Sequence, residues 1–368
     1  MNAEQVKGTI CRYLGREYCF LVGRGTTAIH LALKAVERQS GLGELILPTV
    51  CCPSLAQMVI YAGFKPVFAD VTAITFALDA DSFRARITAD TKAVLPVHIF
   101  GYAAPMAEIC DLAREHGIFV IEDAAQSLGG NCDGKKMGSY GEFSILSFGG
   151  DKILNAGGGG ALVTDDAKLA RLIEREMKNL PPFARPLEYS LKSLSHRNLY
   201  HAMVDLLRVN SETRVERIFS RAMPFYEDLY LQSFPEDSIM IERIRNGFER
   251  LDSDNARRVE CAAQYEDLLA GAGAEVMLPT SWHESRVLWR YSFLIKDPAK
   301  TIRVTAALRK NKIHASNHYW SLADLFEGRH DHPNTTYVCP RILNLWTDET
   351  VTGSYIEQSC DIILSALN

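Results

Sequence analysis

Two stretches decide the fold of this chain: IEDAAQSLGG, residues 121–130, and SFGGDKILNAGGGGALVTDD, residues 147–166. In the first stretch, Asp123 ends the apolar run IFVIE. In the second, Lys152 lies between an apolar strand pattern that ends near Ser147 and a run of four glycines. Open α/β sheets bind their ligands at the carboxyl ends of strands. We therefore expect the acid and the lysine to border one ligand site.

Short apolar runs alternate with amphipathic stretches around these two segments. The runs expected to form strands are residues 43–48, 65–71, 92–100, 118–124, 142–148 and 160–164. Apolar residues at helical spacing predict helices over 26–39, 54–63 and 104–117. Several of the expected strands are apolar on both faces, which is typical of a parallel sheet covered by helices. The first half of the chain therefore predicts an α/β fold with a mostly parallel, doubly wound sheet.

The second half of the chain is less regular. Its first part, from about 166 to 250, is charged and mainly helical in pattern, and a long helix is expected over 253–271. A smaller α/β pattern follows, with strands over 289–296 and 342–346, a helix over 301–312, and a last helix for which Thr347 is the expected N-cap. We expect a large domain, residues 1–250, that includes this atypical helical segment, and a small C-terminal domain, residues 251–368.

The composition argues against several classes of protein. Of 368 residues, 47% are hydrophobic and the formal net charge is -5, so neither nucleic acid nor an anionic membrane is an expected partner. No apolar run approaches the roughly 20 residues that span a bilayer, and the N-terminus lacks the pattern of a secretory signal. The nine cysteines lack zinc-like spacing, which indicates reduced thiols in a cytoplasmic protein. No metal site is expected, because His330 and His332 have no third ligand at helical spacing.

The residue types of the two stretches indicate the chemistry of the site. A lysine amine, an anion and a set of phosphate donors are the parts that hold pyridoxal phosphate (PLP), an aldehyde cofactor with a cationic ring nitrogen. We expect Lys152 to form the Schiff base and Asp123 to keep the ring nitrogen protonated, while Glu122 points away because side chains alternate along a strand. The alternatives are a surface lysine, and an acid that caps a helix or binds a ribose; no G-x-G-x-x-G lies upstream to support the ribose.

Further residues are candidates for cofactor contacts. Gln126 is a candidate for the phenolic oxygen of the ring, or else an ordinary first-turn residue of a helix. An amphipathic helix starts at Gly25, Thr26 and Thr27, and its free N–H groups would bind a phosphate, although simple capping by Thr26 would give the same pattern. Ser147 can supply a second phosphate hydroxyl. The glycine run is not a P-loop, because no Gly-Lys-Ser/Thr follows it; it is expected to allow a turn and close packing behind the lysine.

These motifs, in this order, resemble the DegT/DnrJ/EryC1/StrS family of fold-type-I PLP-dependent aminotransferases, which is best known for aminating keto-sugars. The resemblance extends over nearly the whole chain. The matching segments are RGTTAIHLAL (24–33), EDAAQ (122–126), SFGGDKILNAGGGG (147–160), HYWSL (318–322) and RILNLW (341–346).

The resemblance implies a role for each matched residue. Lys152 corresponds to the Schiff-base lysine that also moves protons, Asp123 to the acid at the ring nitrogen, and Gln126 to the contact of the ring oxygen. The matched phosphate positions are Gly25, Thr26, Thr27 and Ser147. His318 and Tyr319 fall where members of the family contact substrate, although lone residues of these types are as often packing residues.

Two departures from the family pattern concern the cofactor. Cys52 occupies the position of an aromatic residue that stacks on the ring, so the ring either loses this partner or receives one from elsewhere. The Asn-x-Arg-Met pattern ahead of the long helix is absent from residues 223–252. Members of the family are homodimers with shared active sites, so we expect a homodimer here, but the neighbouring subunit's phosphate contact is in doubt.

The function implied by the resemblance is transamination. An amino group would move from an amino acid, glutamate in this family, to a keto-sugar or sugar-like ketone of sugar-nucleotide or antibiotic biosynthesis. A keto-sugar dehydratase is disfavoured, because relatives of that type replace the lysine with histidine and this chain retains Lys152. A non-catalytic regulatory protein with a PLP fold is the other alternative, and the intact pair of Lys152 and Asp123 argues against it.

Overall fold

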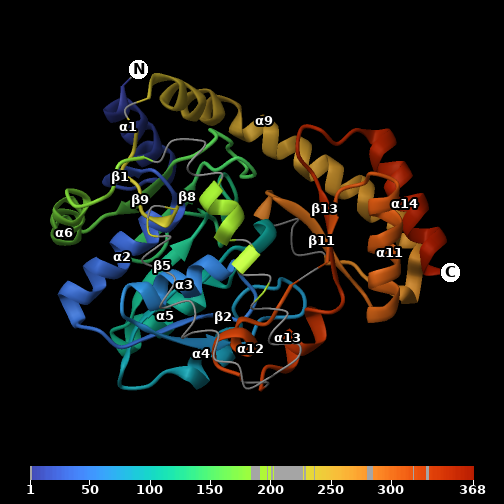
Figure 1. Ribbon diagram of the computed structural model, residues 1–368, viewed down its shortest axis with the longest axis horizontal. Coiled ribbons are helices and arrows are strands. Elements are labelled where there is room, and N and C mark those ends of the chain that lie inside the picture. Colours follow the sequence, from blue (N-terminus) through green and yellow to red (C-terminus); the bar gives the residue numbers. More distant parts are fainter. Residues whose placement is uncertain are drawn as a thin grey trace.

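The computed structural model describes residues 2–183, 191–196, 198, 199, 202, 227, 229–235, 237–279, 285–317, 319–328 and 331–368. A seven-stranded sheet forms the larger part of it (Figure 1). In spatial order the strands are β1 (Tyr18–Val22), β9 (Gly160–Thr164), β8 (Phe143–Ser147), β5 (Phe119–Asp123), β4 (Thr91–Val94), β2 (Glu44–Pro48) and β3 (Lys65–Ala69). Within this sheet, β9 runs antiparallel to both of its neighbours and the other pairs are parallel. The expected mostly parallel sheet is confirmed, and β1 is a strand that the sequence analysis missed.

Helices cover both faces of this sheet, as a doubly wound fold requires. Alternation along β2 sends Leu45 and Leu47 into one apolar cluster and Ile46 into the other. The first cluster contains residues of α2 (Gly25–Ser40), α3 (Pro53–Tyr61) and α6 (Ala167–Met177). The second contains residues of α1 (Ala3–Leu14), α4 (Ala80–Arg86) and α5 (Met106–His116). Burial of two faces by helices explains why the strands are apolar on both sides.

A second sheet is built from C-terminal residues. Its antiparallel strands are β10 (Val276–Met277), β11 (Arg290–Ile295), β13 (Ile342–Trp346) and β12 (Ala315–Ser316). The helices α11 (Pro298–Lys310) and α14 (Gly353–Leu367) pack beside it, and the 32-residue helix α9 (Ser238–Leu269) connects the two parts of the molecule (Figure 1). The proposed boundary between residues 250 and 251 falls inside α9, so the division into domains 1–250 and 251–368 stays a prediction.

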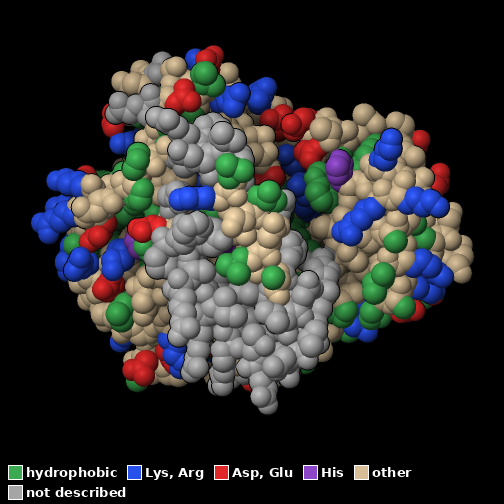
Figure 2. All heavy atoms as spheres, in the orientation of Figure 1, with side chains coloured by type: hydrophobic (Ala, Val, Ile, Leu, Met, Phe, Trp, Pro, Cys, Tyr) green, Lys and Arg blue, Asp and Glu red, His purple; other side chains and the backbone are tan. Residues whose placement is uncertain are grey.

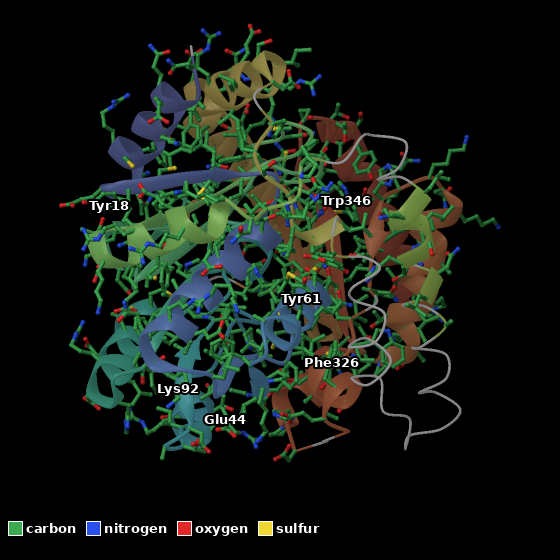
Figure 3. All side chains as sticks on the ribbon, turned by 60° about the vertical axis from the view of Figure 1, so that its left-hand side comes forward. Tyr18, Glu44, Tyr61, Lys92, Phe326 and Trp346 are labelled. Carbon is green, nitrogen blue, oxygen red and sulfur yellow. The ribbon has the colours of Figure 1, made fainter. Side chains whose placement is uncertain are left out.

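The remaining elements are short. They are η1 (Ile99–Gly101), β6 (Asn131–Cys132), β7 (Lys135–Lys136), η2 (Ala270–Glu275), α12 (Leu322–Phe326) and α13 (Pro333–Val338). Glu44 and Lys92, labelled in Figure 3, lie where β2 and β4 begin, so the carboxyl ends of these strands meet at the opposite edge of the sheet.

The start of the last helix differs from the expectation. The helix begins at Gly353, and the side chain of Thr352 caps it by accepting a hydrogen bond from the N–H of Tyr355. Thr347 is fully buried at the end of β13, where its hydroxyl donates to the carbonyl of Leu288 (3.0 Å). The prediction of Thr347 as N-cap is therefore wrong, because a tertiary contact uses this hydroxyl.

The surface carries charges of both signs (Figure 2), and the cysteines form no disulfides. In Figure 2, basic and acidic side chains are interspersed on both sides of the face shown. None of the helices in the described ranges has the length and apolarity needed to cross a membrane. All nine cysteines are free thiols. A cytoplasmic location stays a prediction.

Candidate active site

A cavity of about 360 Å³ opens at the carboxyl ends of β5 and β8, beside the first turns of α2 and α3. Most of the residues proposed from the sequence line it: Gly25, Thr26, Cys52, Asp123, Gln126, Ser147 and Lys152. A larger cavity of about 640 Å³ between α5 and residues 133–142 contains none of them. The chemistry of the lining residues, rather than cavity size, therefore identifies the candidate site.

Asp123 lies at the end of β5 and is buried. Burial raises the pKa of its carboxyl group, although the N–H of Ala125 (2.9 Å) and the charge of Lys152 act in the opposite direction. Residues 124–130 form mainly turns rather than a helix, so Asp123 is not a helix N-cap. A buried carboxylate whose charge is incompletely balanced fits a ligand that brings a cation, such as a protonated ring nitrogen.

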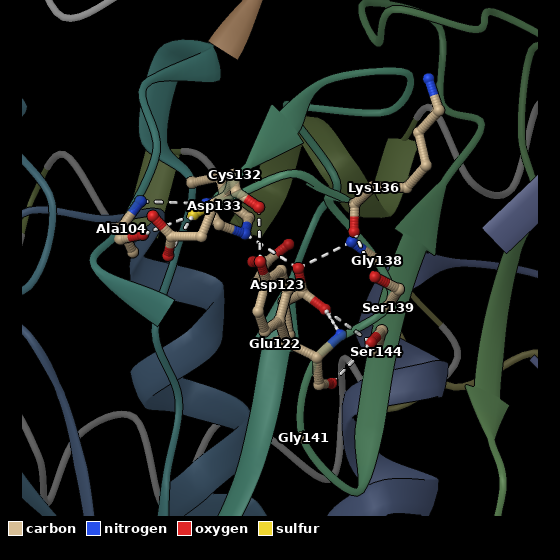
Figure 4. Close-up of polar contacts among 12 residues, drawn as sticks. Ala104, Glu122, Asp123, Cys132, Asp133, Lys136, Gly138, Ser139, Gly141 and Ser144 are labelled. Carbon is tan, nitrogen blue, oxygen red and sulfur yellow. Dashed lines mark hydrogen bonds and ion pairs between the residues drawn. The ribbon is translucent and has the colours of Figure 1, made fainter. Parts of the chain in front are cut away.

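Glu122 points to the other face of β5, which confirms the expected alternation. Its carboxylate accepts hydrogen bonds from the N–H groups of Gly138 (2.6 Å) and Tyr140 (2.8 Å) and from the hydroxyl of Ser144 (2.7 Å) (Figure 4). His98 is the fourth partner of this carboxylate, with 2.9 Å between the Nε2 atom of His98 and Oε1 of Glu122. The N–H of Ala104 donates to Nδ1 of His98 (3.0 Å), so the proton of a neutral ring lies on Nε2 and is donated to Glu122.

The Glu122 network is expected to stabilise the strand that carries Asp123. Replacing Glu122 with Gln puts an amide NH₂ among N–H donors, so we expect a loss of about 1–3 kcal/mol in the free energy of unfolding. Urea denaturation of the Glu122→Gln protein measures it. The matched control is Glu108→Gln on the exposed surface of α5. Its free energy of unfolding is expected to lie within about 0.5 kcal/mol of that of the parent protein. Equal stability of the two variants would contradict this role.

Lys152 lies in the loop after β8, and an aromatic residue from the C-terminal part holds this loop. The Lys152 Nζ atom is 5.1 Å from the ring centroid of Trp289. The indole N–H of Trp289 donates to the carbonyl of Asp151, the residue before the lysine. Trp289 in turn lies parallel to Phe100, with 6.4 Å between ring centroids. The sequence analysis missed Trp289, because it is distant along the chain and its surroundings are typical only of a strand.

A buried arginine follows Trp289. The guanidinium of Arg290 lies between the rings of Trp289 and Trp346, at 4.2 Å from each centroid, and donates to the carbonyl of Trp289 (2.8 Å). Trp346, labelled in Figure 3, ends β13. Burial lowers the pKa of Arg290 to about 10, which the nearby Asp348 partly opposes. The two indoles therefore hold a cation close to the loop of the lysine.

The glycine run serves close packing, as expected. Gly157 and Gly159 have φ values of 81° and 90°, which favour glycine. A Cβ atom on Gly160 would lie 2.7 Å from the backbone nitrogen of Gly25 and 2.8 Å from the carbonyl oxygen of Leu146. The run therefore lets β9 approach the first turn of α2 directly.

The Gly160→Ala protein is expected to lose about 1–3 kcal/mol in the free energy of unfolding, because a backbone must shift to admit the methyl group. The shift also moves the first turn of α2, so cofactor affinity should fall. Gly150→Ala is the control in the same loop, where a Cβ atom has open space. Thermal denaturation and cofactor titration of both variants measure the effect, and a Gly160→Ala protein indistinguishable from Gly150→Ala would contradict it.

The first turn of α2 offers N–H groups rather than hydroxyls to an anion. Arg24 occupies the N-cap position of α2, so the interpretation of Thr26 as N-cap is wrong. The guanidinium of Arg24 has only donors, so the Arg24 side chain cannot accept a hydrogen bond from the N–H groups of the first turn. Thr26 and Thr27 each donate their hydroxyl hydrogen to the carbonyl of Tyr230, at 2.8 Å. Thr27 is also fully buried and does not line the cavity. The backbone N–H groups of this turn are therefore the donors that remain for a phosphate.

Gly25 leaves space for such an anion. A Cβ atom at Gly25 would lie 3.1 Å from Cβ and 3.4 Å from Oγ of Ser147, so a larger residue would fill the gap between α2 and β8. Gln126 accepts a hydrogen bond from the N–H of Phe100 through its Oε1 atom (2.7 Å). Its amide NH₂ group is then the end that can donate to a ring oxygen.

Of the other predicted positions, Cys52 lines the cavity and Tyr319 does not. Cys52 is exposed at the N-cap of α3, with its Sγ atom 3.1 Å from Oγ of Ser54. The Tyr319 hydroxyl accepts from Nδ2 of Asn344 (2.6 Å), and burial raises its pKa to about 12; Tyr319 does not line the cavity. His318 lies outside the described residues.

Of the two histidines weighed as a metal pair, only His332 is described, and it does not line this cavity. His332 is buried with its Nε2 atom 3.1 Å from the carbonyl of Phe68, and His330 lies outside the described residues. In the described part of the chain, no three His, Cys, Asp or Glu side chains gather as metal ligands would.

A lysine and a buried acid at the carboxyl edge of a mostly parallel seven-stranded sheet define the fold-type-I PLP-dependent enzymes. The chain belongs to the DegT/DnrJ/EryC1/StrS aminotransferase family, whose sequence model matches residues 2–181 and 244–364. The cofactor of this family is pyridoxal phosphate. The buried carboxylate of Asp123 and the uncapped first turn of α2 fit its two charged ends.

Individual relatives differ in what they act on. The chain is 42% identical to a GDP-perosamine synthase of Caulobacter vibrioides over 161 residues, which are 43% of this chain and 42% of that protein. It is 28% identical to an L-glutamine:scyllo-inosose aminotransferase of Streptomyces griseus over 83% of this chain and 65% of that protein. For most of the curated relatives, the match spans less than half of their length.

Solved structures share the fold. An aminotransferase from Psychrobacter cryohalolentis has a TM-score of 0.78 with this chain at 21% identity, covering 98% of this chain and 89% of that one. The expected fold type is therefore confirmed.

Proposed function

We propose that this chain is a PLP-dependent aminotransferase that moves an amino group from an amino acid, glutamate on the family resemblance, to a keto-sugar or sugar-like ketone. The observation that carries the proposal is that Lys152 and Asp123 line one cavity at the carboxyl edge of the sheet. The activities named for the relatives from Caulobacter and Streptomyces support a nucleotide-linked sugar and a cyclitol as the two acceptor classes.

Each residue has a distinct task in this proposal. The cofactor, when bound, supplies an aldehyde that takes up an amine and a ring that withdraws electrons. Lys152 holds the cofactor through its ε-amine and, once released, carries a proton to and from the substrate carbon. Asp123 provides the negative charge that keeps the ring nitrogen protonated. Gln126 donates its amide NH₂ to the ring oxygen.

The remaining contacts orient the cofactor. The N–H groups of Gly25, Thr26 and Thr27, together with the Ser147 hydroxyl, bind the phosphate. Cys52 borders the ring. The family resemblance alone assigns substrate contacts to His318 and Tyr319, and Tyr319 does not line this cavity. Trp289 keeps the loop of Lys152 in place through the carbonyl of Asp151. We further propose a homodimer with shared active sites, on the grounds of the family resemblance, and a cytoplasmic location, on the grounds of the cysteine pattern.

The test converts the protein to the aminated form of its cofactor with an amino donor and then adds ketones. Nucleotide-linked keto-sugars, keto-cyclitols and free keto-sugars are compared for their ability to restore the absorption of the aldehyde form. At least one ketone should restore it and appear as an amine in the product mixture. A deoxy product would favour a dehydratase instead, and bound cofactor that reacts with no amino donor would favour a non-catalytic regulator.

A further inference from the structure

A non-glycine residue next to the cavity has a strained backbone. Phe100, in the short turn η1, has a φ of 58° and a ψ of 4°, which lie in the left-handed region that favours glycine. A residue with a side chain stays in this region only where its surroundings fix it, and such residues are common at functional sites. The contacts of Phe100 therefore indicate what the turn does.

The backbone of Phe100 holds the side chain of Gln126. The N–H of Phe100 donates to Oε1 of Gln126, at 2.7 Å. Because an N–H can only donate, the atom of Gln126 on this side must be the carbonyl oxygen, and the NH₂ group lies on the other side of the amide. Gln126 lines the cavity, and within the described ranges its NH₂ group has no hydrogen-bond partner. The amide is thus fixed at its oxygen and available at its nitrogen.

The segment that leads into this turn also lies beside Asp123. The N–H of Asp123 donates to the carbonyl of Pro96 (2.9 Å), and the N–H of His98 donates to the carbonyl of Asp123 (3.2 Å). Together with the bond from Phe100 to Gln126, these contacts join residues 96–100 to residues 123–126. The same segment therefore supports both the acid proposed for the ring nitrogen and the amide proposed for the ring oxygen.

The C-terminal part of the chain holds the turn from the other side. The backbone N–H of Trp289 donates to the carbonyl of Phe100 (2.8 Å), and the two rings are parallel within 7°. The ring of Tyr319 meets the ring of Phe100 edge-on, with 5.2 Å between centroids. A Cβ atom on Gly101 would lie 2.8 Å from the carbonyl oxygen of Val287, so the turn packs directly on that backbone. These contacts explain how the strained conformation persists.

We propose that Phe100 is a positioning residue: its N–H selects one orientation of the Gln126 amide, with the NH₂ group toward the ring oxygen of the cofactor. The inference rests on the proposed function, since it requires the cofactor in the cavity. Phe100 does not line the cavity and acts only through Gln126. Without this contact the amide is free to turn over, which would put its oxygen, an acceptor, beside the ring oxygen, another acceptor.

The pH dependence of the visible absorption of the bound cofactor reports this contact. A donor to the ring oxygen stabilises the negative charge on that oxygen, so the nearby nitrogen of Lys152, joined to the cofactor, holds its proton less tightly. Loss of the donor therefore raises the pH midpoint of the absorption change. A hydrogen bond to a charged oxygen corresponds to a shift of about 1 pH unit.

The test compares Phe100→Leu with Phe76→Leu. Both phenylalanines are 1% exposed, both have a left-handed φ (58° and 59°), and their ring centroids are 6.1 Å apart. Leucine keeps the backbone N–H but removes the ring that packs on Trp289 and Tyr319, so the turn is no longer fixed. We expect the midpoint to rise by about 0.5 to 1 pH unit in Phe100→Leu and by less than about 0.2 in Phe76→Leu.

A double-mutant cycle distinguishes positioning from a purely structural role. Gln126→Met keeps the length of the side chain and removes its donor, so it should raise the midpoint by about 1 pH unit. Because Phe100 acts through Gln126, adding Phe100→Leu to Gln126→Met should change the midpoint little further. Additive shifts would assign Phe100 a structural role only, and equal midpoints in Phe100→Leu and Phe76→Leu would exclude positioning. Both results overturn the proposal.

Phe100→Gly covers a failure of Phe100→Leu to fold, because glycine adopts this φ without strain and keeps the N–H. It also lacks the ring, so its midpoint should rise in the same direction, and an unchanged midpoint would contradict the proposal. Borohydride reduction of each variant tests the proposed function separately. A label at Lys152 with unchanged midpoints would reject the inference on Phe100 alone, whereas the absence of a label from the parent protein would reject the proposed function.

Discussion

Replacement of Lys152 by alanine is expected to abolish transamination and the visible absorption of the bound cofactor. The ε-amine is the group that holds the cofactor and then carries the proton, and no other amine among the described lining residues of the cavity could replace it. The rate should fall by at least roughly 10⁴-fold, since both the covalent attachment and the acid–base group are lost. Single-turnover kinetics and an absorption spectrum of the Lys152→Ala protein measure the two effects.

Lys136→Ala is the matched control for this experiment. Lys136 belongs to the β6–β7 hairpin, where its amine lies over the ring of Tyr13 at 5.1 Å, and it does not line the cavity. This variant should keep both turnover and absorption. After borohydride reduction of the parent protein, peptide mapping should find the label at Lys152. A label at another lysine, or a Lys152→Ala protein that still turns over, would refute the assignment.

Replacement of Asp123 by asparagine should lower the turnover number by roughly 10²-fold or more, because a preorganised charge opposite the developing negative charge is lost. The size and shape of the side chain are retained, and its Oδ1 can still accept from the N–H of Ala125. Without the anion, the ring nitrogen should lose its proton at neutral pH. The ¹⁵N shift of ring-labelled PLP reports that proton directly.

Glu122→Gln is the control one position away on the same strand. Its side chain faces Gly138, Tyr140 and Ser144 instead of the cavity. That variant should lose stability but keep the protonated ring nitrogen and nearly normal turnover while folded. A ring nitrogen that stays protonated in Asp123→Asn would remove Asp123 from its proposed role.

The strands near the site were predictable because their signals are local. Asp123 and Ser147 end apolar runs that form buried strands. A polar residue at the end of such a run marks the carboxyl edge of a parallel sheet, where ligands bind. The alternation that turns Glu122 away from Asp123 follows from strand geometry alone. The glycines around 157–160 likewise indicate a close approach of backbones wherever they occur.

Contacts between distant segments were not predictable in the same way. Trp289 reaches the loop of Lys152 from the second sheet, and His196 reaches the cavity from a segment with no recognisable pattern. The hydroxyl of Thr27 looks suited to a phosphate in the sequence, but Tyr230 uses it. Hydrogen bonds of this kind depend on which segments meet in space, and residue spacing along a chain carries no record of that.

The amino-acid sequence by itself determined the doubly wound sheet, the family, and the expectation that Lys152 and Asp123 border one cavity. Each of these depends on periodicity or on short motifs, which are properties of neighbouring residues. The tertiary structure alone decided which hydroxyls are already used by a backbone carbonyl and which aromatic residue holds the lysine loop. Those features arise when strands and helices far apart in the chain pack together, because burial then commits each donor and acceptor to one partner.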